Sequence, residues 1–139
     1  KDQAYIAPKR SLFNKIVGDN HFELEFASFL DGCDDLISFV KNSQSTAFRI
    51  EYRNADGSIA NYIPDFVVKR NATEVWIIET KGREDLDDPA KWERLQQWCA
   101  DATLHDGKRS FHALFVRQEE WDAHRPTTFG QLITTFDGA

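Results

Sequence analysis

Apolar residues along the chain follow two different periods, one typical of helices and one typical of strands. Near the N-terminus, Phe22, Phe26 and Leu30 recur at four-residue spacing, which predicts a helix over about residues 19–31. Further along, apolar residues alternate with charged ones, as expected for strands with one buried face. The predicted strands are 47–53, 59–69, 74–81 and 110–117, and further helices are predicted over 87–106 and 127–136. Residues 34–41 fit either a short helix or a strand.

The order of these elements, α-β-β-β-α-β-α, predicts an α/β fold. Helices and strands interleave, so we expect a mixed central sheet flanked by helices. Turn signals at 54–57 and 70–73 separate the three consecutive strands. Residues 1–18 are predicted to be an N-terminal tether, because the first ten are mostly polar and include a proline. The folded domain is therefore expected to be 19–139.

Length and composition support one folded domain. The chain has 139 residues, of which 41% are hydrophobic and 29% charged, a balance typical of globular domains. No apolar run is long enough to span a membrane and no signal peptide is recognisable, so a cytoplasmic location is expected. The chain contains no Met and begins at Lys1, which indicates a piece of a longer protein. Cys33 and Cys99 match no metal-ligand spacing and are predicted to be reduced, buried thiols.

The formal net charge of the chain is -6, which does not favour nucleic-acid binding, because affinity for phosphate comes mainly from Lys and Arg. A sum over the whole chain hides local patches, however. Carboxylates that hold a metal ion also make a site acidic until the ion binds.

Charged residues at the ends of two apolar strands are the main candidates for chemistry. The apolar run 75–78 leads directly into Glu79-Thr80-Lys81, and the period of two places Glu79 and Lys81 on one face. A symmetric turn centred on Ala72 would place Asp65 opposite Glu79, with Cβ atoms roughly 4.5–5.5 Å apart. A register one residue out of phase would separate the two carboxylates onto opposite faces.

Two adjacent carboxylates favour either a shared proton or a divalent cation, and the oxygen-rich surroundings favour Mg²⁺, with Mn²⁺ as a substitute in vitro. Asp65, Glu79 and the backbone carbonyl of Thr80 would supply three oxygen ligands. Lys81 would orient a water or stabilise charge on a phosphate. These groups together suit phosphodiester hydrolysis.

The spacing Pro64-Asp65 followed by Glu79-Thr80-Lys81 resembles the motif of the PD-(D/E)xK nuclease superfamily, and the predicted α-β-β-β-α-β order resembles its restriction-endonuclease-like core. The chain looks most like the C-terminal endonuclease domain of type III restriction enzymes, in the restriction (Res) subunit. The likeness spans roughly residues 19–116. It is carried by the segments HFELEFASFL, FRIEY, and YIPDFVV followed by WIIETKGRED.

The resemblance implies a Mg²⁺-dependent endonuclease in which Asp65 and Glu79 bind the metal and Lys81 is catalytic. It also implies an acidic residue on the first helix, for which Glu23 fits best and Glu25 is the fallback; the two lie about 200° apart around a helix, so only one can face the site.

The expected partners are double-stranded DNA, a helicase-like ATPase portion of the same natural chain, and a methyltransferase (Mod) subunit. A transient dimer of nuclease domains would cut both strands.

Two alternatives remain open at this stage. One is a non-catalytic DNA-binding or structural module on the same fold, and the other is a repair nuclease or junction resolvase. Arg83, Lys91 and Arg94 follow the motif and are candidate DNA contacts. A solvated loop explains Arg83 equally well, and a solvated helix face is the default interpretation of Lys91 and Arg94.

Overall fold

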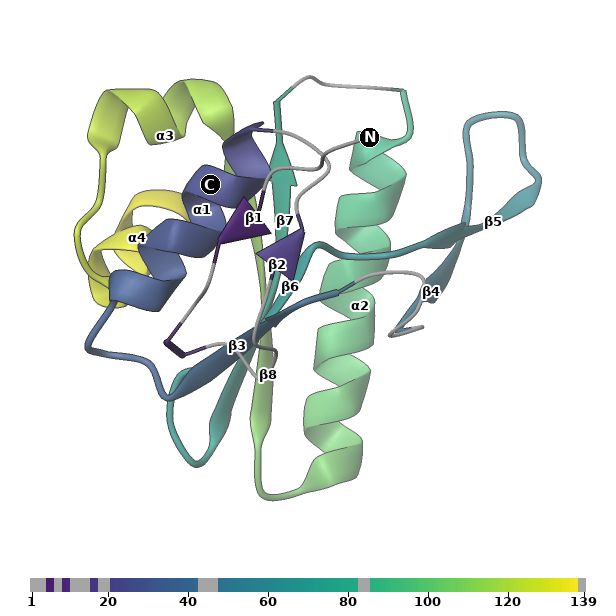
Figure 1. Cartoon of the computed structure of the whole chain (residues 1–139). Coiled ribbons are helices and arrows are strands. Elements are labelled where there is room, and N and C mark those ends of the chain that lie inside the picture. The colour runs from purple at the N-terminus through teal and green to yellow at the C-terminus, as the bar shows by residue number, and fades with distance from the viewer. Residues whose placement is uncertain are drawn as a thin grey trace.

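The computed structural model of the chain describes residues 5–6, 9–10, 16–17, 21–42, 48–82 and 86–137. Figure 1 shows a central sheet with α2 on one side and α1, α3 and α4 on the other. The helices are α1 (His21–Gly32), α2 (Asp88–Asp106), α3 (Gln118–His124) and α4 (Phe129–Phe136). The strands are β1 (Tyr5–Ile6), β2 (Ile16–Val17), β3 (Ser38–Lys41), β4 (Ile50–Arg53), β5 (Ile59–Tyr62), β6 (Phe66–Lys69), β7 (Glu74–Lys81) and β8 (Ser110–Arg117). The predicted mixed α/β architecture is confirmed.

In the part of the chain that the structure describes, the central sheet contains four strands in the order β3-β6-β7-β8. The pairs β3–β6 and β6–β7 are antiparallel, whereas β7 and β8 are parallel and are joined by α2. A parallel pair requires such a crossover connection. The C-terminal ends of β7 and β8 consequently lie side by side, with Lys81 opposite Arg117.

Strand β7 is buried on both faces, which explains its uninterrupted apolar sequence. Trp76 and Ile78 belong to a core cluster that includes residues of α1, α3 and α4, whereas Val75 and Ile77 belong to a second cluster that includes residues of α2. Successive side chains of a strand point to opposite faces, so the two clusters alternate along β7. Burial extends through residues 79 and 80, so the strand carries a glutamate into the interior.

The prediction of one strand over 59–69 is wrong. This segment forms two strands, β5 and β6, which belong to different sheets. Strand β5 pairs with β4 in a separate two-stranded sheet, and β6 pairs with β3 and β7 in the central one. The chain changes sheets over 63–65. Pro64 has no N–H with which to continue a ladder, so it favours a break at this position.

Smaller differences concern element boundaries. Within 34–41 only 38–41 form a strand, and the strand predicted over 47–53 begins at Ile50; residue 47 lies outside the described residues. Helix α3 was not predicted, because Trp121 is its one buried residue and a single apolar position has no period.

The segment predicted to be a tether contains β1 and β2, which pair with each other, and the Arg10 carbonyl accepts a hydrogen bond from the Phe39 N–H. The boundary of the tether at residue 18 stays a prediction. In the described part of the chain, no helix combines the length and the apolar character that crossing a bilayer demands.

Candidate functional site

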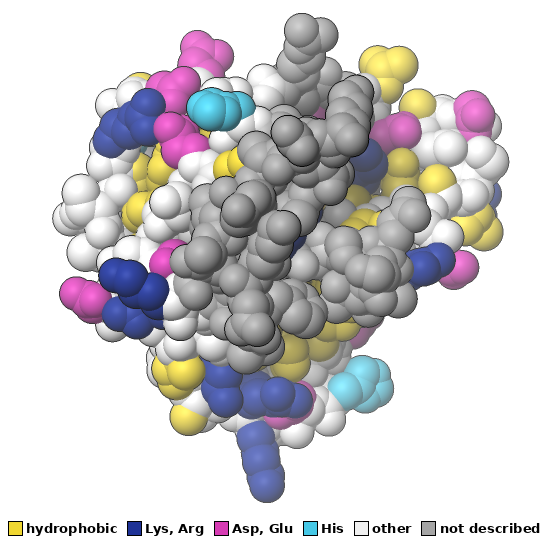
Figure 2. Space-filling view, in the orientation of Figure 1, with side chains coloured by type: hydrophobic (Ala, Val, Ile, Leu, Met, Phe, Trp, Pro, Cys, Tyr) yellow, Lys and Arg dark blue, Asp and Glu magenta, His cyan; other side chains and the backbone are white. Residues whose placement is uncertain are grey.

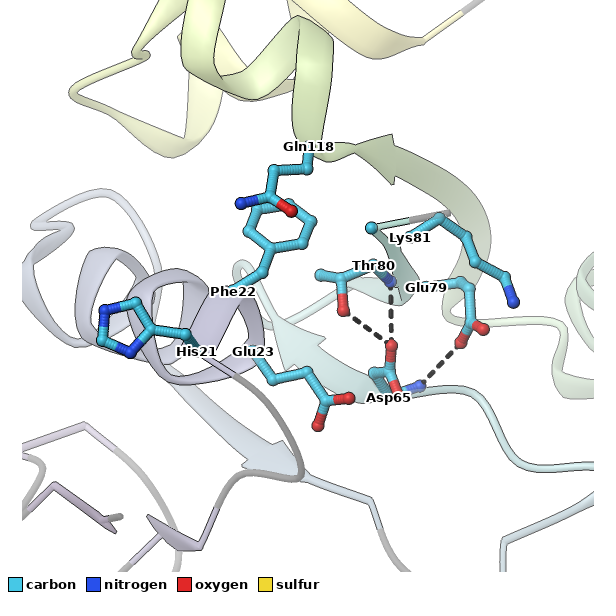
Figure 3. Close-up of a pocket in the computed structure, with 9 residues that line it drawn as sticks. His21, Phe22, Glu23, Asp65, Glu79, Thr80, Lys81 and Gln118 are labelled. Carbon is cyan, nitrogen blue, oxygen red and sulfur yellow. Dashed lines mark hydrogen bonds between the residues drawn. The ribbon is translucent and has the colours of Figure 1, made fainter. Parts of the chain in front are cut away.

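The residues predicted to carry chemistry meet in one cavity of about 520 Å³ where the N-terminus of α1 approaches the C-terminal ends of β7 and β8. Figure 3 shows the residues around this cavity. Its lining residues are His21, Phe22, Glu23, Asp65, Glu79, Thr80, Lys81, Gly82 and Gln118. All four predicted catalytic residues and Thr80 are among them.

The β6–β7 hairpin has the register that the sequence predicted. Phe66 pairs with Ile78 and Lys69 pairs with Val75, so continuation by one residue places Asp65 opposite Glu79. The Asp65 N–H donates to Glu79 Oε1 over 3.2 Å. The hairpin therefore brings two carboxylate-bearing residues together at its open end.

Pro64 frees the backbone of Thr80 at this open end. The same register places Pro64 opposite Thr80, and a proline has no N–H to donate to the Thr80 carbonyl. The N–H and the hydroxyl of Thr80 instead donate to Asp65 Oδ2, over 2.9 and 2.7 Å (Figure 3). A carbonyl without its ladder partner, next to two carboxylates, suits a third oxygen ligand for a cation.

Asn42 fixes the position of the Pro64-Asp65 segment. Its side-chain amide donates to the carbonyls of Pro64 and Phe48, and its backbone N–H donates to the Asp65 carbonyl over 2.7 Å. Asn42 is buried, so these hydrogen bonds are sheltered from water. The end of β3 thus supports the strand segment that carries Asp65.

Glu79 is a buried carboxylate with an unusual electrostatic environment. Its residue is 7% exposed. Burial, followed by the negative charge of Asp65, raises the pKa of Glu79 well above its ordinary value, while Lys81 and Lys91 oppose the rise. A carboxyl group in this position either keeps a proton or requires a cation.

Lys81 extends from the same strand end and forms an ion pair with Asp88 in the first turn of α2, with 3.2 Å between Nζ and Oδ1. Figure 3 shows the Glu79 and Lys81 side chains extending to the same side of β7, as the period of two predicted. The ammonium group is therefore held between the cavity and the beginning of α2.

The geometry of α1 favours Glu23 over Glu25 as the helix carboxylate of the site. Glu23 lines the cavity, whereas Glu25 accepts hydrogen bonds from Trp121 Nε1 at 3.0 Å and from Arg125 Nη1 at 3.1 Å. Glu25 thus joins α1 to α3. Glu23 pairs instead with Lys41 on β3, with 3.2 Å between Oε1 and Nζ.

Of the three candidate DNA contacts, Arg83 lies outside the described residues, and Lys91 and Arg94 do not line the cavity. Lys91 Nζ lies 5.8 and 5.9 Å from the ring centroids of Tyr52 and Tyr62, and Arg94 Nε donates to the Glu51 carbonyl on β4. On the face drawn in Figure 2, the described Lys and Arg side chains occur in small groups, several with acidic side chains nearby.

Among the described residues at or near the site, several were not singled out from the sequence, including Lys41, Asn42, Asp88 and Gln118. Gln118 could have been found, because it follows β8 and the ends of two parallel strands meet at one edge. A Cβ at Gly82 would lie 3.3 Å from Gln118 Oε1, so the glycine gives this side chain room beside the end of β7. Lys41, Asn42 and Asp88 depend on how β3 and α2 dock, for which the sequence carries no local signal.

The residues present fit a hard divalent cation in part. Asp65 and Glu79 are adjacent, burial and the Asp65 charge outweigh the compensation of Glu79 by Lys81 and Lys91, and carboxylate and carbonyl oxygens, the ligand type that Mg²⁺ prefers, dominate this end of the hairpin. Among the described residues, no three acidic, His or Cys side chains converge into a group able to hold a metal ion. A cation here would therefore rely on two carboxylates, the Thr80 carbonyl and water, a ligand set ordinary for Mg²⁺.

Comparison of the chain with protein-family models, with curated proteins and with solved structures finds no match in any of the three.

Proposed function

We propose that the chain is a Mg²⁺-dependent endodeoxyribonuclease domain of the PD-(D/E)xK type, which hydrolyses phosphodiester bonds of double-stranded DNA. One observation carries the proposal: the open end of the β6–β7 hairpin places Asp65 beside Glu79, next to Thr80 and Lys81, in one cavity. Burial and the Asp65 charge raise the pKa of Glu79, and this arrangement is hard to explain by folding stability alone.

Each residue has a distinct part in the proposed reaction. Asp65, Glu79 and the Thr80 carbonyl would hold Mg²⁺, which when bound supplies Lewis-acid stabilisation of the negative phosphate. Lys81 places a positive charge at the same edge of the cavity, where it can stabilise charge that develops on the phosphate oxygens. Asp88 holds the Lys81 ammonium through their ion pair and so limits its rotation.

The wider context follows from the resemblance of the sequence to the Res subunit of type III restriction enzymes. In that context a helicase-like ATPase portion of the natural chain and a methyltransferase (Mod) subunit deliver the domain to DNA in the cytoplasm. Delivery by a larger assembly is compatible with a chain of net charge -6, because the domain then need not attract DNA by itself. Two such domains would meet transiently to cut both strands.

A second candidate is a non-catalytic module on the same fold. The observation that favours it is the Lys81–Asp88 ion pair. The Lys81 side chain is 16% exposed, and the Asp88 carboxylate already balances its charge. If this pair is permanent, Lys81 offers no charge to a phosphate and the cavity serves another purpose.

Cleavage of DNA with Mg²⁺ tests the proposal. Supercoiled and linear duplex DNA are incubated with the chain and with the Asp65→Ala and Lys81→Ala variants, and a branched junction substrate tests for a resolvase-type preference. We expect cleavage by the parent and a loss of at least about a hundredfold in both variants. Equal cleavage by parent and variants would show that the activity does not arise at this site.

A further inference from the structure

Glu23, which shares the cavity with Asp65 and Glu79, forms a buried ion pair with Lys41. Glu23 Oε1 lies 3.2 Å from Lys41 Nζ, and the two side chains are only 9% and 10% exposed. Glu23 lines the same cavity as Asp65 and Glu79, yet among the described residues no third acidic side chain joins these two in a group able to hold a metal. Figure 3 shows the Glu23 carboxylate on the other side of Asp65 from Glu79.

Lys41 is held in place by the strand that supports Asp65. Lys41 pairs with Phe66 across the β3–β6 ladder, and the next residue, Asn42, donates its backbone N–H to the Asp65 carbonyl. The ammonium group also donates to the Asn42 carbonyl over 3.1 Å and lies 5.7 Å from the ring centroid of Phe66. Strand β3 thus fixes the Lys41 ammonium group at the edge of the proposed site.

We infer that Lys41 is a positioning residue that keeps Glu23 from becoming a third ligand of the cation bound by Asp65 and Glu79. The inference rests on the proposed cation site and adds a division of labour to it. Asp65 and Glu79 would bind the cation, whereas Glu23 lines the cavity and is held by its ion pair with Lys41. Without Lys41, Glu23 would lose this buried ion pair, and a cation bound in the cavity that Glu23 lines could replace the lost charge.

If Lys41 restrains Glu23 in this way, its loss should change Mg²⁺ affinity in the opposite direction to the loss of a residue that supports the metal ligands. Loss of a residue that merely supports a metal ligand through a hydrogen bond typically lowers the metal affinity about 10- to 100-fold. Loss of Lys41 should instead raise the affinity for Mg²⁺, because the substitution removes a positive charge near the cavity and makes the Glu23 carboxylate available as a ligand. Cleavage should slow at the same time, because Glu23 leaves the position from which it faces the cavity.

Isothermal titration calorimetry of the full 139-residue chain with MgCl₂ provides a readout independent of activity. We expect Lys41→Met and Lys41→Gln to bind Mg²⁺ about tenfold more tightly than the parent. Lys41→Arg, which keeps the charge, should stay within about twofold of the parent. The Lys41→Met/Glu23→Gln double variant should return to within about threefold, because it lacks the carboxylate that Lys41 restrains.

The matched control is Arg125→Met, which breaks the Glu25 ion pair on the same helix but outside the cavity and should leave Mg²⁺ affinity unchanged. Thermal unfolding of each variant confirms that the chain is folded. Mg²⁺ affinity in the two Lys41 variants that is equal to or weaker than that of the parent would overturn the inference, as would a parent that binds no Mg²⁺.

Cleavage assays on the same proteins distinguish this inference from the proposed function. We expect kcat for DNA cleavage to fall about tenfold in Lys41→Met with little change in KM, since Lys41 is not among the residues that line the cavity. A parent that binds Mg²⁺ but cuts no DNA would contradict the nuclease proposal, and the affinities of the Lys41 variants would still decide the role of Lys41.

Discussion

The two ends of strand β7 each carry a glutamate, and the two glutamates have opposite environments. At the closed end of the β6–β7 hairpin, Glu74 accepts hydrogen bonds from Asn71, Trp76 and Arg70. At the open end, Glu79 is buried beside Asp65. The pKa of Glu74 is lowered, chiefly by the Asn71 hydrogen bond, whereas burial and then Asp65 raise that of Glu79.

The difference separates a carboxylate that its surroundings supply with hydrogen-bond donors from one that is buried beside a like charge. Glu74 is surrounded by donors, and Asn71 Oδ1 accepts from the N–H groups of Thr73 and Glu74, so the turn satisfies its own polar groups. Glu79 has a second carboxylate as its neighbour, which destabilises the sheet unless a proton or a cation intervenes. A buried like-charge pair at the end of a strand is therefore a stronger sign of a binding site than a glutamate alone.

The largest expected effect is on catalysis. Under the proposed function, Glu79→Gln should lower the rate of Mg²⁺-dependent DNA cleavage about a thousandfold, equivalent to ~4 kcal/mol of transition-state stabilisation, because it removes a charged oxygen from the proposed cation site. The variant should be at least as stable as the parent without Mg²⁺, because the buried repulsion with Asp65 is gone. Cleavage rates and thermal unfolding of the same preparation measure both quantities.

Glu74→Gln is the matched control at the other end of the strand. It should keep the parent cleavage rate and lose about 1 kcal/mol of stability, since partly exposed hydrogen bonds to a charged group are broken. The comparison fails if the variants exchange effects, with Glu74→Gln inactive or Glu79→Gln destabilised.

A second prediction concerns the dependence of stability on pH without metal. The folded state keeps a proton on Glu79 at pH values where the unfolded chain has lost it, so raising the pH favours unfolding. The melting temperature should therefore fall as the pH rises from the ordinary glutamate value of 4.5 through the raised pKa of Glu79. Scanning calorimetry of the parent and of Glu79→Gln should show several degrees less decline in the variant.

The opposite sign is expected for Glu74. Its lowered pKa contributes stability that is present above the ordinary value of 4.5 and is lost as the pH falls through the lowered pKa. Asp35 has a lowered pKa as well, so the contribution of Glu74 is read as the difference between the parent and Glu74→Gln below pH 4.5. If the melting temperature of Glu79→Gln depends on pH in the same way as that of the parent, the electrostatic difference between the two ends of β7 does not exist.

The hairpin at the centre of this contrast could be predicted from the sequence because its determinants are local. The apolar run 75–78 and the turn centred on Ala72 set the strand and the register, and both agree with the structure. The split of 59–69 was missed although Pro64 marks it, since an alternating pattern extends across the proline. Alternation reports which residues are half-buried and does not report which sheet buries them.

The partners of the site residues could not be predicted, because they come from other helices and strands whose docking is a tertiary property. Lys41 reaches Glu23 only once β3 has paired with β6 and α1 has packed over the sheet. Asp88 reaches Lys81 only when α2 has docked. These are tertiary contacts between residues 7 to 18 positions apart with no common motif, so composition and periodicity do not encode them.

The smallest expected effect tests the role of Pro64 in opening the hairpin. Pro64→Ala introduces an N–H opposite Thr80, where an extended ladder would let it donate to the Thr80 carbonyl. That carbonyl would then be less available to Mg²⁺, and we expect affinity to weaken about threefold. Stability should change little, because the additional hydrogen bond of about 0.5–1.5 kcal/mol offsets the greater entropy of the unfolded chain without proline. Calorimetric titration measures the Mg²⁺ affinity, and denaturant unfolding measures the folding stability. Unchanged affinity in a folded Pro64→Ala variant would mean that the Thr80 carbonyl is not a ligand, leaving Asp65 and Glu79 to bind the cation with water alone.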